Sequence, residues 1–252
     1  MFNFFAKEAP DSNGSFYISG TDFNHIKNVL RMKSGDKILV SFEGKSYPCT
    51  LEDFQGDSAC ATITDASFRN TELSVKLHLF QGIPKADKME LIIQKCTELG
   101  VSEITPAQMS RCVVKLEEKK KKSKTERWQA IAESAAKQSK RSVVPTVNMP
   151  LSFKSLIDAS SDFDLFLVPY ENEEGMLGTK KVLSEIRKGM KIGIVIGPEG
   201  GFDEKEIAAL RDAGCKTVSL GQRILRTETA AITAIAMLML HCETEIEDEN
   251  ND

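Results

Sequence analysis

Residues 192–202 read IGIVIGPEGGF, an apolar run that leads directly into a loop with three glycines and one proline. Glycine adopts positive φ angles at no steric cost and lets the backbone approach a ligand closely. The loop contains neither the G-x-G-x-x-G dinucleotide-binding pattern nor the P-loop pattern. Taken alone, it fits a tight strand-to-helix connection and one wall of a ligand site equally well.

Strand and helix patterns alternate on both sides of this loop. Such alternation predicts an α/β domain with a mostly parallel sheet. In open parallel sheets, ligands bind beyond the carboxyl ends of the strands. A polar loop is expected over Gln81–Lys88. The expected strands cover residues 73–79, 101–105, 143–147, 163–168, 192–196 and 217–220.

Capping boxes mark the starts of the expected helices. In a capping box, an N-cap side chain accepts from the helix backbone, and a Glu three residues later reaches back to the N-cap residue. The matching pairs are Asp87 with Glu90, Ser123 with Glu126, and Asp203 with Glu206.

The first 70 residues have a different pattern, in which short strand-like runs are separated by turns rich in Gly, Ser and Asp. These runs, with one helix that begins at Asp22, predict a small β-barrel. Small barrels often bind RNA, but a fold alone establishes no function. The expected strands cover residues 15–18, 37–42, 47–51 and 59–63. The predicted organisation is a β domain over residues 1–70, an α/β domain over 71–243 and an acidic disordered tail over 244–252.

The composition is that of a globular protein, with 41% hydrophobic and 28% charged residues. The longest apolar run, residues 230–240, is too short to span a bilayer, and the N-terminus lacks the features of a signal peptide. Six isolated cysteines and three dispersed histidines fit neither a disulfide framework nor a metal site. We expect a soluble, cytoplasmic protein without a membrane partner or a metal ion.

The net charge of −4 is unevenly distributed. Residues 243–252 carry six acids and no base, which leaves 33 basic and 31 acidic residues in the rest of the chain. Residues 111–141 contain eleven Lys or Arg against four Glu. A run such as Lys119–Lys122 is usually a solvated helix face or linker, so charge alone does not establish a nucleic-acid partner.

Residues 220–230 read LGQRILRTETA and follow the last expected strand. Ile224 and Leu225 lie in a loop between Arg223 and Arg226, where apolar side chains have no obvious surface role. They fit the lining of a pocket for a flat apolar ring, with the arginines facing an anion.

Two acids and an apolar helix lie close to this loop in the predicted fold. Glu199 and Glu228 fit general acid–base chemistry, although a glutamate such as Glu228 more commonly caps a helix. Residues 231–240 are apolar nearly all round, so their helix is either a central core helix or part of a subunit interface. The residues therefore predict a ligand cleft without naming its chemistry.

Six blocks of the sequence together resemble a known family. The chain is similar, over about residues 1–242, to the RsmE-type 16S ribosomal RNA uridine-N3 methyltransferases of the SPOUT class. The most specific blocks are GPEGG at 197–201 and LRTETA at 225–230. The others are HIKNVLRM at 25–32, KME at 88–90 with QKCTELGV at 94–101, SRC at 110–112, and RW at 127–128 with QS at 138–139.

The resemblance implies a fold and an activity. The fold would be α/β, with a C-terminal SPOUT domain whose mostly parallel sheet carries a trefoil knot, a rare exception to unknotted chains, and a small N-terminal PUA-like β-barrel that helps to dock RNA. S-adenosyl-L-methionine would bind in the knot in a bent conformation. The enzyme would act as a homodimer on one uridine of 16S rRNA in the assembled small ribosomal subunit.

The resemblance also implies roles for individual residues. Arg226 would stabilise the developing uridine anion, and Glu228 would accept the N3 proton, although Arg226 as a phosphate clamp and Glu228 as a helix cap are equally open. The implied RNA-binding residues are Arg31, Lys88, Lys95, Arg111, Arg127, Lys137 and Arg141. The implied cofactor-binding residues are Val168, Tyr170, Glu171, Ile196, Gly197, Pro198, Glu199, Gly200, Gly201, Leu220, Gly221, Arg223, Ile224, Leu225, Thr229 and Ala230.

The chain departs from the family pattern at both ends. It begins MFNFF, whereas some relatives carry arginines before the first strand, and its acidic tail has no counterpart. Two other functions stay open: ribose 2′-O-methylation of tRNA or rRNA by the same fold, and a non-catalytic RNA-binding role in ribosome assembly.

Overall fold

The computed structural model describes the whole chain except residues 66, 68–69, 171–174 and 247–252. The described chain divides into two compact units. The first unit contains residues 1–72 and 134–144, and the second contains residues 73–133 and 145–252. Residues 134–144 therefore join the β unit, although the sequence assigned them to the α/β domain.

The first unit is built on a curled five-stranded sheet with the order β1–β3–β4–β5–β2. All its pairs are antiparallel except β1 with β3. Helix α1 (Gly20–Asn24) continues into a π-helical turn, η1 (His25–Val29). The four strands expected from the sequence are confirmed. The strands are β1 (Phe2–Phe5), β2 (Ser15–Ser19), β3 (Lys37–Phe42), β4 (Lys45–Gln55) and β5 (Ser58–Ile63).

Strand β1 was not expected from the sequence. The run FNFF has no regular alternation of apolar and polar residues, so its strand character comes from its partner. Its residues pair in parallel with β3, with Phe2 opposite Ile38, while Phe4 lies fully inside the core of the sheet.

An ion pair fastens the segment after helix α3 (Glu118–Ser139) to this first unit. Arg141 is 3% exposed, and its Nε donates to the Glu72 carboxylate at 3.2 Å. The same carboxylate accepts from the backbone N–H groups of Ser142 at 3.0 Å and Val143 at 3.2 Å. Asn3 Nδ2 donates to the Arg141 carbonyl at 2.9 Å. Long-range polar contacts of this kind have no local sequence signal.

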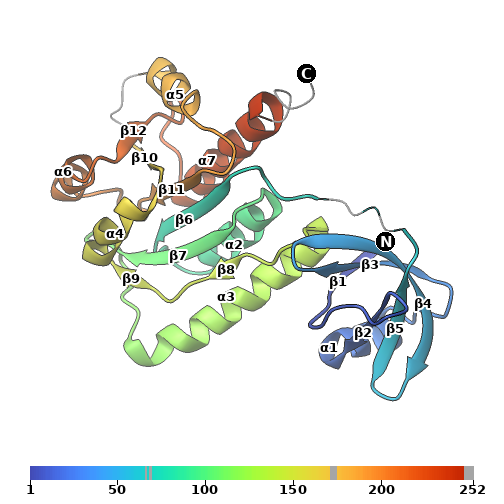
Figure 1. Cartoon of the computed structure of the whole chain (residues 1–252). Helices are drawn as coiled ribbons and strands as arrows, with labels where there is room; N and C mark the ends of the chain where they lie inside the picture. Colours follow the sequence, from blue (N-terminus) through green and yellow to red (C-terminus); the bar gives the residue numbers. More distant parts are fainter. Residues whose placement is uncertain (66, 68–69, 171–174, 247–252) are drawn as a thin grey trace. The chain divides into compact units, whose positions relative to one another are not determined.

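The second unit contains a seven-stranded sheet in which every recorded strand pair is parallel, as the sequence predicts. Its order is β12–β10–β11–β6–β7–β8, and β9 pairs with β7 (Figure 1). The strands are β6 (Lys76–Gly82), β7 (Glu103–Gln108), β8 (Thr146–Val147), β9 (Leu151–Ser152), β10 (Leu165–Pro169), β11 (Lys191–Ile196) and β12 (Lys216–Val218).

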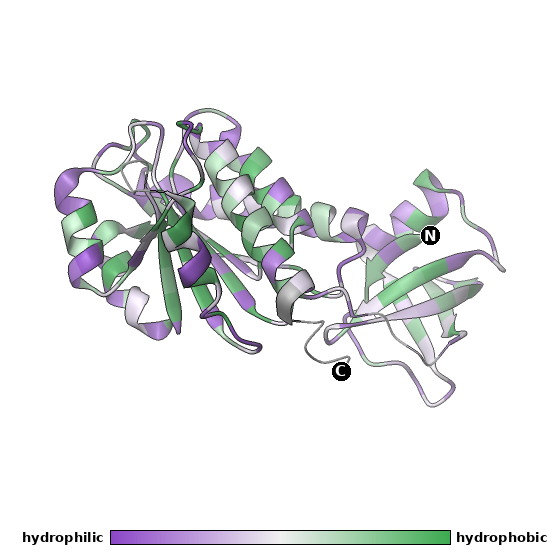
Figure 2. Ribbon diagram, turned by 90° about the horizontal axis from the view of Figure 1, so that it is seen from above, coloured by the Kyte–Doolittle hydropathy of each residue, from purple (hydrophilic) through white to green (hydrophobic). Residues whose placement is uncertain are grey.

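Helices cover both faces of this sheet, and each face buries its own apolar cluster. Leu77 and Leu79 of β6 pack with α2, α3 and α7, whereas Phe80 lies in the opposite cluster with α4 and α6. Figure 2 shows hydrophobic strands inside this unit and hydrophilic residues on the outer helices. The remaining helical segments are α2 (Lys88–Glu98), α4 (Phe153–Ala159), η2 (Ser160–Asp162), α5 (Met176–Leu183), α6 (Glu204–Asp212), α7 (Thr227–His241) and η3 (Cys242–Ile246).

Among the described residues, no helix combines the length and the apolar character that crossing a membrane would require. All six cysteines are free and buried. The first three residues of the expected acidic tail, 244–246, continue the chain as part of η3, and residues 247–252 lie outside the described residues.

The capping predictions have three different outcomes. The box at Asp203 and Glu206 is confirmed: Asp203 Oδ1 accepts from Lys205 N at 3.0 Å, and Glu206 Oε2 accepts from Asp203 N at 2.9 Å. Asp87 is the N-cap residue of α2, but its side chain makes no cap hydrogen bond. The start at Ser123 is wrong, because α3 already begins at Glu118.

The early start of α3 has a local cause. The residues from Glu118 onward are mostly Glu and Lys, which are good helix formers, and Glu118 pairs with Lys121 one turn later. The lysine run at 119–122 is thus a helix surface. The polar loop expected from Gln81 is also corrected, because β6 continues to Gly82 and Gln81 is buried.

We expect Arg141→Met to lower the free energy of unfolding by about 2 kcal/mol, because the half-buried Glu72 carboxylate loses its charged partner. Urea unfolding followed by circular dichroism measures the change. The exposed neighbour Lys140, whose hydrogen bonds are made by its backbone N–H and carbonyl, supplies the control Lys140→Met, expected within about 0.5 kcal/mol of the parent. Equal stability of the two variants would contradict the proposed importance of the ion pair.

Candidate active site

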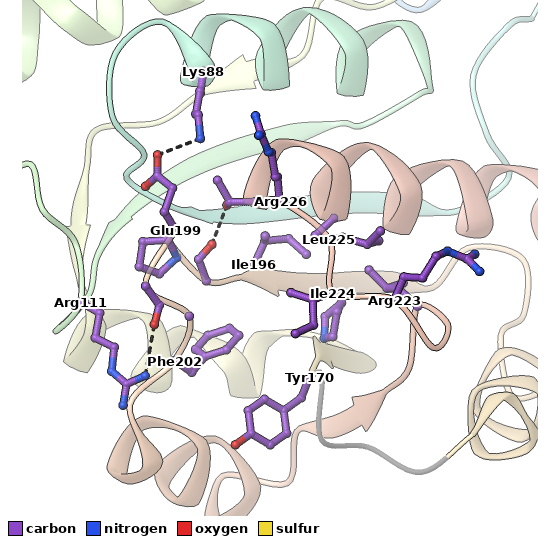
Figure 3. A pocket seen from close by; sticks show the side chains of 18 of the residues that line it. Lys88, Arg111, Tyr170, Ile196, Glu199, Phe202, Arg223, Ile224, Leu225 and Arg226 are labelled. Atoms are coloured by element: carbon purple, nitrogen blue, oxygen red, sulfur yellow. Dashed lines mark hydrogen bonds and ion pairs between the residues drawn. The ribbon is translucent and has the colours of Figure 1, made fainter.

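A pocket of about 630 Å³ lies at the carboxyl ends of β10, β11 and β12 (Figure 3). The loops that follow these strands all reach it, and residues from the start of α2 and from the segment after β7 complete its wall. Five segments that are separate in the sequence therefore meet at one site. The lining residues are Lys88, Arg111, Pro169, Tyr170, Ile196, Gly197, Pro198, Glu199, Gly200, Gly201, Phe202, Glu204, Leu220, Gly221, Arg223, Ile224, Leu225, Arg226, Thr227 and Ala230.

The glycine loop after β11 turns tightly under the pocket. Gly201 N donates to the Pro198 carbonyl at 2.9 Å, and Gly201 has a φ of +68°, which favours glycine. A Cβ at Gly200 would lie 2.9 Å from the Cβ of Arg111. Two positions of the loop therefore depend on the missing side chain, so the loop is built for close backbone approach.

The loop after β12 supplies apolar side chains and two arginines. Ile224 is 82% exposed and lines the pocket with Leu225 and Tyr170. Among the described residues, neither Arg223 nor Arg226 has an ion pair or a hydrogen bond from its side chain. The loop thus presents apolar surface and unneutralised positive charge, as its sequence suggested.

A charged cluster forms another part of the wall. The Lys88 ammonium lies 3.2 Å from Glu199 Oε1 and 3.2 Å from Glu228 Oε2, and Figure 3 shows Lys88 pointing from α2 toward Glu199. Lys85 N donates to Glu199 Oε1 at 3.0 Å. One cation therefore holds two carboxylates, one from the glycine loop and one from the first turn of α7.

These contacts shift two pKa values in opposite directions. Contacts with the carboxylates of Glu199 and then Glu228 raise the pKa of Lys88. Burial acts to raise the pKa of Glu199, but the Lys85 N–H, the loop backbone and the Lys88 ammonium outweigh it, so this pKa lies below its usual 4.5. At neutral pH the Lys88–Glu199 pair is therefore fully ionised.

Arg111 contacts the glycine loop through its guanidinium group. Its Nη1 donates to the Gly200 carbonyl at 3.1 Å, and its Nη2 lies 3.7 Å from Asp203 Oδ2. The adjacent Ser110 N donates to Glu206 Oε1 at 2.8 Å. Arg111 is thus both part of the pocket wall and a support for the loop.

Most residues expected at the cofactor site lie in this pocket, with three exceptions. Val168 is fully buried in the core beneath the pocket, Thr229 is exposed on α7 and outside the lining, and Glu171 lies outside the described residues. Four lining residues were expected neither at the cofactor site nor in any other role: Pro169, Phe202, Glu204 and Thr227. Pro169, Phe202 and Thr227 each lie next to an expected residue in the sequence. Their position within or beside the motifs could therefore have predicted them. Nothing in the sequence points to Glu204.

The residues expected to bind RNA divide into several groups. Lys88 and Arg111 line the pocket. Arg31 is exposed, with a φ of +53°. Three others are each held in an ion pair: Lys95 with Glu98 at 2.8 Å, Arg127 with Glu90 at 2.8 Å, and the partly buried Lys137 with Asp22 at 2.7 Å.

The structure corrects the placement of Arg141. Its guanidinium is buried against Glu72, so it is not available to a phosphate. The charge pattern gave no warning, because Arg141 closes the same basic stretch as the exposed lysines.

The two residues expected to be catalytic lie on either side of the start of α7. Arg226 is the N-cap residue, and its exposed side chain lines the pocket. Glu228 lies in the first turn with its side chain 14% exposed, paired with Lys88, and it is outside the lining of the pocket. Among the described residues, no group of three His, Cys, Asp or Glu is arranged to hold a metal ion.

Two family models match the chain, the RNA methyltransferase domain over residues 71–239 and the RNA methyltransferase PUA domain over residues 18–64. The protein named ribosomal RNA small subunit methyltransferase E of Bacillus subtilis is 41% identical over 241 residues, which cover 94% of this chain and 93% of that protein. Its namesake in Mesomycoplasma hyopneumoniae is 33% identical over 232 residues, or 92% and 96% of the two chains.

Solved structures match over the same length. A ribosomal RNA small subunit methyltransferase E from Neisseria gonorrhoeae, bound to S-adenosyl methionine, has a TM-score of 0.80 at 31% identity and covers 95% of this chain and 97% of its own. A methyltransferase from Legionella pneumophila in complex with the same cofactor has a TM-score of 0.78 at 29% identity, with coverage of 94% and 96%.

We expect Lys88→Met to raise the pKa of Glu199, because the substitution removes the cation that favours its ionised form. A carboxyl whose pKa is lowered by folding stabilises the folded state above its unfolded pKa and loses this contribution as pH falls. The stability advantage of the parent over Lys88→Met should therefore be present at neutral pH and be lost as the pH falls below 4.5 and through the lowered pKa of Glu199.

Carbon-13 NMR titration of the glutamate carboxyls measures the pKa of Glu199 directly. Lys85→Met is the matched control, because only the backbone N–H of Lys85 contacts Glu199. An unchanged Glu199 pKa in Lys88→Met would show that the ion pair does not form in solution.

Proposed function

The chain belongs to the ribosomal RNA small subunit methyltransferase E family, and from this premise we propose that it methylates N3 of one uridine of 16S rRNA. The cofactor is S-adenosylmethionine and the substrate is RNA of the small ribosomal subunit. The observation that carries the proposal is the convergence of the loops after β10, β11 and β12 on one pocket.

The pocket fits the chemical parts of S-adenosylmethionine. Ile224 and Leu225 offer apolar surface to a flat adenine ring, which accounts for the 82% exposure of Ile224 in a loop. A Cβ at Gly201 or Gly221 would meet no atom within 4 Å, so backbone groups at these lining positions are open to a ligand. Arg223 suits its carboxylate, and Glu199 suits its positive charges. We propose that these loops hold the cofactor.

The chain's own residues have to position the uridine and manage one proton. When bound, S-adenosylmethionine supplies a methyl group activated on a sulfonium ion. Uridine N3 is an imide nitrogen, which is a poor nucleophile until its proton leaves. Holding N3 in line with the methyl group is a positioning effect that contributes up to about 7–11 kcal/mol. The target base must also be exposed, and flipped out if it is stacked.

We propose that Arg226 and Glu228 assist this step. The Arg226 guanidinium has no partner among the described residues and lines the pocket, so we assign to it the stabilisation of the negative charge that develops on uracil. Glu228 lies two residues further on, ionically paired with Lys88. We assign to Glu228, directly or through a water molecule, the acceptance of the N3 proton.

The rest of the chain supports this assignment. The first unit contains the match to the PUA domain of RNA methyltransferases, and we propose that residues 1–70 help to dock RNA while residues 71–243 carry the reaction. Exposed Arg31 is the clearest phosphate contact, joined by Arg127, Lys95 and Lys137 once their ion pairs with Glu90, Glu98 and Asp22 open. With a ribosomal substrate, the working compartment is the cytoplasm.

The second unit also offers a surface for a second copy of the chain. Helix α7 is apolar nearly all round, yet only part of its circumference is buried, and Leu240 is 58% exposed. We therefore propose that the protein forms a homodimer. The trefoil knot stays a prediction from the family resemblance.

The activity is tested with small ribosomal subunits from a strain that lacks the modification. The purified protein with S-adenosylmethionine should transfer one methyl group per subunit, and nucleoside mass spectrometry should identify 3-methyluridine. Methylation on ribose would instead identify a 2′-O-methyltransferase. An absence of transfer together with an absence of S-adenosylhomocysteine binding would identify a non-catalytic RNA-binding protein.

We expect Arg226→Met to lower kcat by roughly 100-fold, because the charge that stabilises the transition state is lost. Affinity for S-adenosylhomocysteine should change by no more than about threefold, since a transition-state interaction affects binding of the product little. Arg226→Lys should recover part of the rate, and single-turnover assays with saturating cofactor measure it. A normal kcat in Arg226→Met would remove Arg226 from the mechanism.

A further inference from the structure

Gln81 is a buried polar residue that neither touches the pocket nor has a role in the proposed reaction. It lies at the carboxyl end of the central strand β6 and is 0% exposed. Its Nε2 donates two hydrogen bonds, one to the Gly82 carbonyl at 2.9 Å and one to Thr227 Oγ1 at 2.9 Å. The side chain thus connects β6 to the first residue of α7.

The hydrogen-bond partners fix the direction of each donor. The Gly82 carbonyl can only accept, so the amide nitrogen of Gln81, and not its oxygen, must face Gly82 and Thr227. Thr227 Oγ1 in turn donates its single proton to the Gly197 carbonyl at 2.6 Å. A directed chain therefore runs from Gln81 through Thr227 to Gly197, the first residue of the glycine loop.

This chain joins the two cofactor loops at their ends. Thr227 follows directly on the loop over residues 220–226, and Gly197 begins the loop over residues 197–201; both residues line the pocket. Without the hydroxyl contact, the two loops would be free to separate at this point. Gln81 donates to this hydroxyl from inside the protein, and its own side chain is buried away from any ligand.

The backbone next to Gln81 approaches the glycine loop equally closely. A Cβ at Gly82 would lie 2.6 Å from Pro198 N and 2.9 Å from Gly197 C. Backbone atoms cannot move aside cheaply, so only glycine fits at this position. The end of β6 therefore contacts the start of the glycine loop through Gly82 as well as through the hydrogen-bond chain.

The side chain of Gln81 carries an energetic penalty in the folded state. Its Oε1 is buried and has no hydrogen-bond partner among the residues that the structure describes. An unsatisfied buried acceptor is unfavourable, and an apolar side chain of similar length would avoid it. A gain in stability therefore does not explain why glutamine occupies this position. The two hydrogen bonds that Gln81 donates explain it better, because they position Gly82 and the Thr227 hydroxyl.

We propose that Gln81 is a positioning residue for the cofactor pocket. Through the Thr227 hydroxyl it sets the relative placement of the 197–201 and 220–226 loops before the cofactor arrives. The inference rests on the proposed function, because the ligand that these loops hold is S-adenosylmethionine. A pocket arranged in advance binds more tightly, since less ordering remains to be done on binding.

The test substitutes Gln81→Met, which keeps the length of the side chain and removes both donors. Affinity for S-adenosylhomocysteine, measured by calorimetry without RNA, should fall by about tenfold, the equivalent of about one hydrogen bond. KM for S-adenosylmethionine should rise, while KM for the small subunit stays unchanged. The urea midpoint should be equal to or above that of the parent, because the unsatisfied oxygen is gone.

Substitutions of Thr227 probe the same contact from its other end, and so keep the test valid if Gln81→Met folds poorly. Thr227→Val removes the hydroxyl and should weaken binding as much as Gln81→Met does. Thr227→Ser keeps the hydroxyl and should recover most of that loss. In the double variant, Gln81→Met with Thr227→Val, the two losses should not add, because both break one chain.

The control removes a buried hydrogen-bonding hydroxyl elsewhere in the sheet. Thr105 of β7 bonds His78 at 2.7 Å and Asn148 at 2.9 Å and lies outside the pocket lining. Thr105→Val should lower the urea midpoint and leave the affinity for S-adenosylhomocysteine unchanged.

Three results would overturn the inference. Parent-like affinity in both Gln81→Met and Thr227→Val would show that the chain positions nothing, while the proposed function would stand. A fall in affinity that parallels a fall in the urea midpoint would make Gln81 a merely structural residue. If the parent protein itself fails to bind S-adenosylhomocysteine, the proposed function and this inference fall together.

Discussion

The parallel register of strands β12, β10, β11 and β6 is the constraint on which the site depends. Val218 pairs with Pro169, and Ile196 pairs with Gln81, so all four strands end at the same edge of the sheet. The loops that follow β10, β11 and β12 therefore start side by side although up to about fifty residues separate them. Helices α2 and α7 add their first turns at this edge, and the pocket follows from this geometry.

The walls of the pocket differ in chemical character, and each difference has a use in methyl transfer. Ile224, Leu225 and Tyr170 give an apolar region, the glycine loop gives accessible backbone, and Lys88 with Glu199 and Glu228 gives a fixed ionic cluster. Arg223 and Arg226 carry positive charge that is not neutralised within the described part of the chain. In the proposed reaction, these regions would bind the cofactor and stabilise the charge that forms when N3 of uridine loses its proton.

Local features were predictable from the sequence, and long-range ones were not. The strand over 192–196 and the capping box at Asp203 depend on neighbouring residues, and both were found. The pairing of β1, the burial of Arg141 against Glu72 and the approach of Lys88 to Glu199 each join residues that are distant in the chain, and charge or hydropathy patterns carry no information about such contacts. Gln81 illustrates the difference best: its polarity predicted a loop, whereas its partners place it inside a strand. The site motifs were found because glycines and apolar loop residues are unusual where they stand.

The most direct measurement is a crystal structure of the protein with S-adenosylhomocysteine. The account predicts the adenine ring against Ile224 and Leu225, its edge facing backbone groups of the 197–201 and 220–225 loops, and the Thr227 hydroxyl still bonded to Gly197. A ligand bound elsewhere on the molecule, or contacts to only one of these loops, would contradict the claim that their convergence creates the cofactor site.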